Sequence, residues 1–130
     1  MILDSSALLA LVFREPGHER VLSAITAAGR IGIGAPTLSE AGIVLTARLG
    51  KEARPTLALL LEQLDLTVIP FEAVHARVAR QAFDRYGRGR HRAALNFGDC
   101  LTYAIAEVSG LPLLFVGDDF AQTDLVPALP

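Results

Sequence analysis

The sequence predicts one α/β domain over residues 1–130, with three layers in which helices cover both faces of a central parallel sheet of four to five strands. Short apolar runs alternate with longer segments of helical spacing, which is typical of a parallel sheet whose strands are joined by helices. The length of 130 residues suits one domain rather than two. A hydrophobic content of 52%, against 20% charged residues, is enough to bury a core and excludes a disordered chain.

The first half of the chain begins with a strand and continues mainly through helices. Residues 1–3 are apolar and end at Asp4, as a buried parallel strand would. Pro16-Gly17, Gly29 and Gly50 each follow a segment of helical spacing and end it. The elements predicted here are a strand at 1–3, helices at 5–14 and 18–28, a strand at 31–33, and helices at 37–49 and 55–64.

The second half alternates in the same way around a glycine-rich break. Residues 66–69 have a β-branched centre and are cut by Pro70, which predicts a strand. The segment 87–90, Gly-Arg-Gly-Arg, ends the next helix and predicts a mobile basic loop. The elements predicted here are a strand at 66–69, helices at 73–86 and 99–109, a strand at 113–116, and a short edge strand at 125–129.

Composition excludes several classes of protein. The single cysteine, Cys100, rules out an internal disulfide and any zinc site with two or more thiolates. No apolar run approaches the roughly 18 residues that span a bilayer. The apolar stretch 7–13 lacks a basic region before it, so it does not resemble a signal peptide. We therefore expect a soluble, cytoplasmic protein with no membrane partner.

Acidic residues recur where a predicted strand ends or a predicted helix begins. Because the carboxyl ends of parallel strands meet at one edge of a sheet, these side chains should converge there. Converging carboxylates repel one another and favour a hard cation such as Mg²⁺ or Mn²⁺. Such a metal activates water and neutralises charge on a phosphate, so the pattern predicts metal-assisted hydrolysis of a phosphodiester. The acids are Asp4, Glu40, Asp99, Asp118 and Asp119.

Each acid also has a purely structural interpretation. Asp4 and Asp99 suit the N-cap position of a helix. The segment 37–40, Thr-Leu-Ser-Glu, matches a capping box in which Glu40 reaches back to the Thr37 amide. The pair at 118–119 could form an Asx turn. The prediction of a site therefore depends on the whole set of acids.

A strongly basic segment lies within a chain whose net charge is −2. Between residues 77 and 92 there are six arginines, and the only acid is Asp84. Arginines attract phosphates, and Tyr86 or Phe83 could stack on a base, although a solvated helix face is the alternative. The segment 88–92 is harder to explain as plain surface, and we predict that it grips a polyanionic substrate. The candidate RNA-binding residues are Arg85, Arg88, Arg90, His91 and Arg92.

The helix predicted at 55–64 is unusually rich in leucine. Leu57, Leu59, Leu60, Leu61 and Leu64 cover more than one helical stripe. Core packing accounts for most of them. The excess indicates a homodimer face or a groove for a partner helix.

Four segments together resemble a PIN domain, and more closely a VapC toxin of a bacterial VapBC toxin–antitoxin pair. They are Asp-Ser-Ser-Ala-Leu at 4–8, Ser-Glu-Ala at 39–41, Asn-Phe-Gly-Asp-Cys at 96–100, and Leu-Phe-Val-Gly-Asp-Asp-Phe at 114–120. The likeness covers essentially the whole chain, in order, and the stretch 89–100 is its most specific part. It implies a PIN-like α/β/α fold.

The resemblance also implies a Mg²⁺- or Mn²⁺-dependent endoribonuclease that cleaves structured RNA such as tRNA or rRNA. The position before Phe120 selects Asp119 as the fourth acid and leaves Asp118 as an outer residue. Ser6 matches a hydroxyl that supports the first aspartate, and Asn96 would orient the loop that holds Asp99. The residues that match the family's catalytic and metal-binding acids are Asp4, Glu40, Asp99 and Asp119.

The family further implies partners. A VapB antitoxin would neutralise a homodimer of the toxin, with its tail in the active-site groove and an arginine competing for the carboxylates. The alternative from another class is a non-catalytic PIN-like module that binds RNA or acts as a scaffold. Such a module would need no metal, and crowding four carboxylates without a cation is costly.

Overall fold

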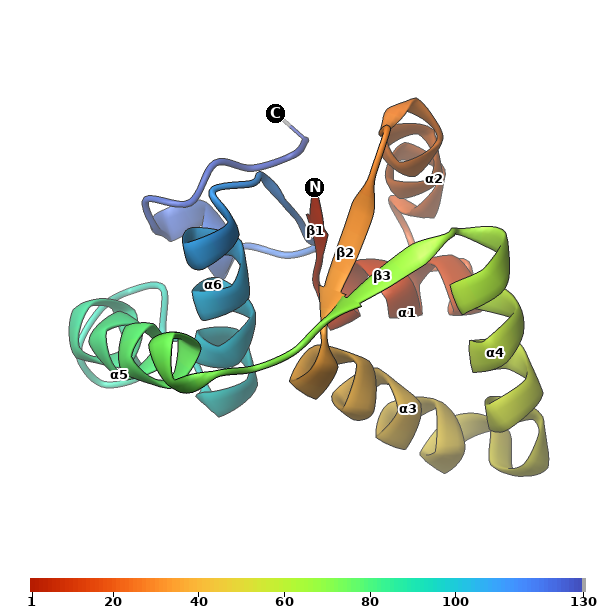
Figure 1. Cartoon of the computed structure of the whole chain (residues 1–130), viewed down its shortest axis with the longest axis horizontal. Coiled ribbons are helices and arrows are strands. Elements are labelled where there is room, and N and C mark those ends of the chain that lie inside the picture. The colour runs from red at the N-terminus through yellow and green to blue at the C-terminus, as the bar shows by residue number, and fades with distance from the viewer. Residues whose placement is uncertain (130) are drawn as a thin grey trace.

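The computed structural model describes residues 1–129. Its centre is a sheet of four strands in the order β3-β2-β1-β4, and every neighbouring pair is parallel (Figure 1). Ile2 lies opposite Gly32 on one side and Leu113 on the other, which fixes the register at the centre. The strands are β1 (Ile2–Leu3), β2 (Ile31–Gly34), β3 (Leu66–Ile69) and β4 (Leu113–Leu114).

Helices cover both faces of this sheet, which confirms the predicted α/β class. Helices α5 and α6 lie on one face of the sheet and α1 and α2 on the other (Figure 1). Ile2 belongs to the core shared with α5 and α6, whereas its neighbour Leu3 belongs to a second core with α1 and α2. The alternation follows from the pleat of a strand, which sends successive side chains to opposite faces. The helices are α1 (Ser5–Phe13), α2 (His18–Ala27), α3 (Ala35–Leu49), α4 (Ala53–Gln63), α5 (Ala73–Tyr86) and α6 (Phe97–Ser109), with short 3₁₀ turns η1 (Gly50–Glu52) and η2 (Phe120–Gln122).

The glycines of β2 allow α6 to lie directly on the sheet. A Cβ at Gly34 would stand only 2.8 Å from Cγ1 of Ile105, which is closer than real Cβ atoms approach. Gly32 is packed in the same way by the side chain of Ile69. The absence of a side chain at Gly34 therefore lets α6 pack close to β2.

Several predicted boundaries differ from the structure. The helix predicted to begin at Asp99 begins at Phe97, because Asn96 rather than Asp99 is its N-cap. The strand predicted at 113–116 ends at Leu114. The edge strand predicted at 125–129 reduces to one parallel bridge between Leu113 and Pro127, so the sheet keeps four strands.

The leucines of α4 divide between core and surface. Leu57, Leu60 and Leu64 are partly buried against the core that contains α1 and α2, so packing explains them. Leu59 remains 53% exposed. Among residues 1–129, no helix is both long enough and apolar enough to cross a bilayer.

Candidate active site

Asp4 lies at the carboxyl end of β1 and is the N-cap of α1. Its Oδ2 accepts hydrogen bonds from the amide of Ser6 at 3.0 Å and from the Ser6 hydroxyl at 2.5 Å. The same hydroxyl accepts from the amide of Val116, 3.0 Å away, just beyond β4. Ser6 therefore fixes the Asp4 carboxylate and ties it to the neighbouring strand end. The N-cap interpretation and a place in the site are both compatible with this position.

A buried pair of hydroxyls lies beneath Asp4. The hydroxyl oxygens of Thr37 and Thr102 are 2.9 Å apart, and Thr102 also hydrogen-bonds to the Asp4 carboxylate. Burial raises the pKa of Asp4; hydrogen bonds from Ser6 and Thr102 oppose that rise, and the charge of Glu40 adds to it. No local pattern in the sequence marks Thr37 and Thr102 as neighbours of Asp4, because these two residues are 65 positions apart and lie on different helices.

Asp99 occupies the first turn of α6 and is held by its own helix start. Its Oδ2 accepts from the Asn96 amide at 2.9 Å, while the Asn96 side chain accepts from the Asp99 amide at 2.9 Å. Burial is the main reason that the pKa of Asp99 is raised to about 6, and the charges of Asp4, Asp119 and Glu40 raise it further. Carboxylates from four parts of the chain thus act on one another at this edge of the sheet.

Glu40 reaches this edge from α3, although its side chain is exposed. The Ser5 hydroxyl donates to Glu40 Oε1 at 2.5 Å, and a Cβ added to Gly98 would collide with Glu40 Oε2. Glu40 therefore lies between the first turns of α1 and α6. The predicted capping box is wrong, because α3 begins at Ala35 and Thr37 already lies within its first turn. Ser5 is a second contact that the sequence analysis missed.

The two acids of the turn after β4 have different surroundings. Asp119 is the N-cap of η2, and its charge raises the pKa of Asp99. Asp118 instead lines a separate hollow of about 610 Å³, together with Gly17 and Thr123. Asp119 is thus close enough for its charge to act on the Asp99 carboxylate.

The donor set fits a hard divalent cation in its chemistry, since it consists of carboxylate oxygens whose charges oppose one another. As the side chains lie, no group of three or more acidic, histidine or cysteine residues within 1–129 is close enough to hold a metal ion. Each of three carboxylates is instead turned toward a local donor: Asp4 toward Ser6, Glu40 toward Ser5, and Asp99 toward the Asn96 amide. Rotation of these side chains would be needed for all of them to share one ion.

The basic loop, residues 88–92, follows α5. Hydrogen bonds from the Arg88 amide to the Leu95 carbonyl and from the Leu95 amide to the Tyr86 carbonyl close its base. Arg88 and Arg92 are exposed, and their side chains make no hydrogen bond or ion pair within residues 1–129. Of the predicted RNA-binding residues, these two are thus the ones most available to a polyanion.

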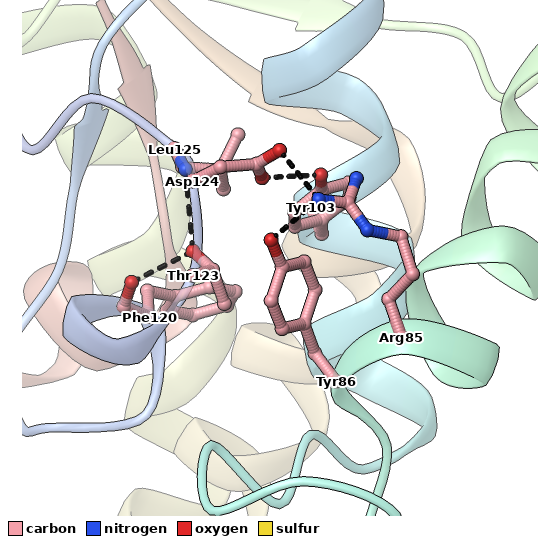
Figure 2. Close-up of polar contacts among 7 residues, drawn as sticks. All are labelled: Arg85, Tyr86, Tyr103, Phe120, Thr123, Asp124 and Leu125. Carbon is pink, nitrogen blue, oxygen red and sulfur yellow. Dashed lines mark hydrogen bonds and ion pairs between the residues drawn. The ribbon is translucent and has the colours of Figure 1, made fainter.

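The remaining candidates for RNA binding are engaged with the protein itself. The Arg90 guanidinium lies over the Phe83 ring at 5.4 Å. The His91 ring packs edge-on against Tyr86, which is only 8% exposed, so the prediction that Tyr86 could stack on a base is wrong. Arg85 hydrogen-bonds to the Tyr86 hydroxyl and forms an ion pair with Asp124 (Figure 2).

A parallel α/β/α fold with acids gathered at the carboxyl edge of its sheet is the arrangement of a PIN domain. The sequence model of the PIN domain family matches residues 1–125. The chain therefore belongs to the PIN domain family.

Similar proteins place the chain among the VapC-type ribonucleases of this family. Ribonuclease VapC36 of Mycobacterium tuberculosis is 51% identical over 126 residues, which cover 96% of this chain and 91% of that protein. The crystal structure of VapC20 from the same species, described as a sarcin-ricin loop cleaving toxin, has a TM-score of 0.80 at 18% identity and covers 99% and 98% of the two chains. VapBC2 of Rickettsia felis, bound to a DNA fragment from its promoter, has a TM-score of 0.75 at 16% identity, with coverage of 98% and 93%.

Proposed function

We propose that residues 1–130 form one PIN domain that acts as a Mg²⁺- or Mn²⁺-dependent endoribonuclease on structured RNA, such as tRNA or rRNA. The observation that carries this proposal is the surroundings of Asp99. Charges of Asp4, Glu40 and Asp119 all act on its carboxylate, although the four acids come from different parts of the chain. Gathering carboxylates in this way is costly unless a cation is shared among them.

The residues that would hold the metal are Asp4, Glu40, Asp99 and Asp119. A bound divalent cation supplies an activated water and neutralises charge on the phosphate. Ser6 would keep one oxygen of Asp4 fixed, and Asn96 would do the same for Asp99. Asp118, which faces a separate hollow, would remain an outer residue.

The basic loop would bind the RNA backbone. Arg88 and Arg92 are exposed with no protein partner in residues 1–129, so their charges remain available to phosphates. Arg90 and His91 lie in the same loop and would add to its attraction for the backbone. Arg85 was also predicted to bind RNA, but its ion pair with Asp124 already neutralises part of its charge.

We further propose that the protein forms a homodimer and that a VapB-type antitoxin binds and inhibits it. The structural likeness to VapBC2 supports the antitoxin. Exposed apolar side chains near the acids also favour a protein partner, since Ile43 and Phe97 are 70% and 79% exposed and line a hollow beside Glu40. An arginine of the partner would pair well with the carboxylates.

The proposal is tested by incubating the purified protein with total bacterial RNA in Mg²⁺, Mn²⁺ or EDTA. We expect discrete fragments that require the metal and disappear with Asp4→Asn. Asp65→Asn is the matched control, because Asp65 is exposed between α4 and β3, away from the other acids. RNA that is bound but left uncut in every metal would contradict the proposal and favour the non-catalytic PIN-like module.

A further inference from the structure

Three side chains form a clasp between α5, α6 and the chain after β4. The Tyr103 hydroxyl donates to Asp124 Oδ1 at 2.7 Å, and Arg85 donates to Asp124 Oδ2 at 3.0 Å (Figure 2). The Arg85 guanidinium also lies over the Tyr86 ring at 4.7 Å. Tyr103 is only 2% exposed, and a buried hydroxyl needs a hydrogen-bond partner, which the Asp124 carboxylate provides. We call Arg85, Tyr103 and Asp124 the clasp.

The clasp fixes the far end of the turn that carries Asp119. Asp119 is the N-cap of η2, and the side chain of Phe120, the first residue of η2, is buried in the core with α6. At its end, the Thr123 hydroxyl donates to the Phe120 carbonyl at 2.7 Å and accepts from the Leu125 amide at 3.3 Å (Figure 2). The turn is therefore a short closed unit whose two anchors are the Phe120 ring and the clasp at Asp124.

The other side of the clasp belongs to the helix that carries Asp99. Tyr103 follows Asp99 by four residues on α6, which is about one helical turn. The bond from Tyr103 to Asp124 thus joins the helix that positions Asp99 to the turn that positions Asp119. No other side-chain hydrogen bond within residues 1–129 links α6 to residues 117–125.

We propose that Tyr103 and Asp124, supported by Arg85, are positioning residues that set the Asp119 carboxylate relative to Asp99. This inference rests on the proposed function, because it treats both acids as ligands of one metal. It gives Arg85 a different task from the one predicted by its place in the basic segment. Arg85 holds Asp124 from the solvent side, so it acts on the acids through the clasp and not on RNA.

The experiment measures Mn²⁺ binding by calorimetry for the full chain, in the absence of RNA. Tyr103→Phe removes one hydroxyl and keeps the ring, and Asp124→Asn keeps the size of the side chain. Each is made in the wild type and in an Asp119→Asn background. Ile105→Val, in the buried face of the same helix, controls for a general loss of stability, which thermal unfolding records for every variant.

We expect Tyr103→Phe and Asp124→Asn each to weaken Mn²⁺ binding by about 10-fold, in the range usual for groups that orient a ligand. In the Asp119→Asn background the same changes should have no further effect. Equal weakening in both backgrounds, or the same weakening with Ile105→Val at matched stability, would overturn the clasp proposal. So would unchanged Mn²⁺ binding in both variants. If the wild type itself binds no Mn²⁺, the proposed function fails and the clasp proposal falls with it.

Discussion

The two regions that the proposed chemistry requires are built in opposite ways. At the acidic edge, Asp4 and Asp99 are partly or fully buried, and hydrogen bonds from neighbouring hydroxyl and amide groups hold them. In the basic loop the backbone is closed by hydrogen bonds, but Arg88 and Arg92 project freely. Metal chemistry requires ligands placed to a fraction of an ångström, whereas attraction to phosphates depends mainly on charge. The exact position of each side chain should therefore matter at the acidic edge, whereas only the charge should matter in the basic loop.

The largest effect should come from Asp99→Asn. It removes a carboxylate charge and keeps the size of the side chain and an oxygen that can accept from the Asn96 amide. We expect RNA cleavage to fall by more than the roughly 100-fold that is usual for changes outside the metal's own ligands. Circular dichroism and thermal unfolding should show an intact fold. Cleavage at the normal rate, once contaminating nucleases are excluded, would show that the site is assigned wrongly.

Thr102→Val should affect both stability and activity. It removes the hydroxyl that supports Asp4 and leaves Thr37 without its buried partner, 2.9 Å away. We expect a loss of about 1–3 kcal/mol in the free energy of unfolding, measured with urea, because an unsatisfied buried hydroxyl is costly. Cleavage should fall by about 10-fold. A variant as active as the wild type would mean that Thr102 serves packing alone.

Gly98→Ala separates activity from stability. The added methyl group would collide with the Glu40 carboxylate, which is the free end of a flexible side chain and can move aside. Alanine also favours a helix over glycine by about 0.5–1 kcal/mol. We expect unchanged or slightly higher stability together with lower cleavage. If cleavage is retained, the position of Glu40 beside α6 is not needed for the reaction.

A double variant in which alanine replaces both Arg88 and Arg92 should change RNA affinity only through the lost charge. RNA binding in EDTA should weaken, and the slope of log affinity against log salt should fall by about 1 for each phosphate that the loop no longer binds. Arg85→Gln is the comparison, since its guanidinium is already paired with Asp124. We expect a salt slope close to that of the wild type for this variant. Equal changes in slope for the two proteins would return Arg85 to the RNA-binding surface.

The smallest expected effect is a change with pH in the melting temperature of the metal-free protein. Because the pKa of Asp99 is raised to about 6 in the folded state, from an ordinary value of 3.8, the ionised carboxylate destabilises the fold near neutral pH. As the pH falls from 7 through 6 toward 4, the folded protein takes up this proton first and gains stability. The melting temperature of the wild type should therefore rise relative to Asp99→Asn over this range. A constant difference between the two proteins would contradict the raised pKa.

The prediction that acids lie at one edge of the sheet could be made from the sequence, because it depends only on where each strand ends. Asp4 and Asp119 follow strands, and the topology of a parallel sheet brings such positions to one edge. The contacts of Thr102 and Arg85 could not be predicted in the same way. Thr102 meets Thr37 across 65 residues, and Arg85 meets Asp124 across 39, so no local pattern marks either pair. In the segment 77–92 Arg85 is one arginine among six, and only the fold separates it from the others.

The boundaries missed from the sequence have local physical causes. The reciprocal hydrogen bonds between Asn96 and Asp99 start α6 two residues earlier than predicted. Within residues 1–129 the tail makes one bridge to the edge strand, through Leu113 and Pro127, and proline has no amide hydrogen with which to extend a ladder. The alternation of strands and helices was predictable because each element has its own hydrophobic period.

The central claim is that the carboxylates at the acidic edge share a divalent cation. The most direct test is a crystal structure of the wild type grown with Mn²⁺, in which anomalous scattering locates the ion. We expect a Mn²⁺ peak in contact with both Asp4 and Asp99. No peak at this edge, in crystals of a preparation that cleaves RNA in Mn²⁺, would contradict the claim.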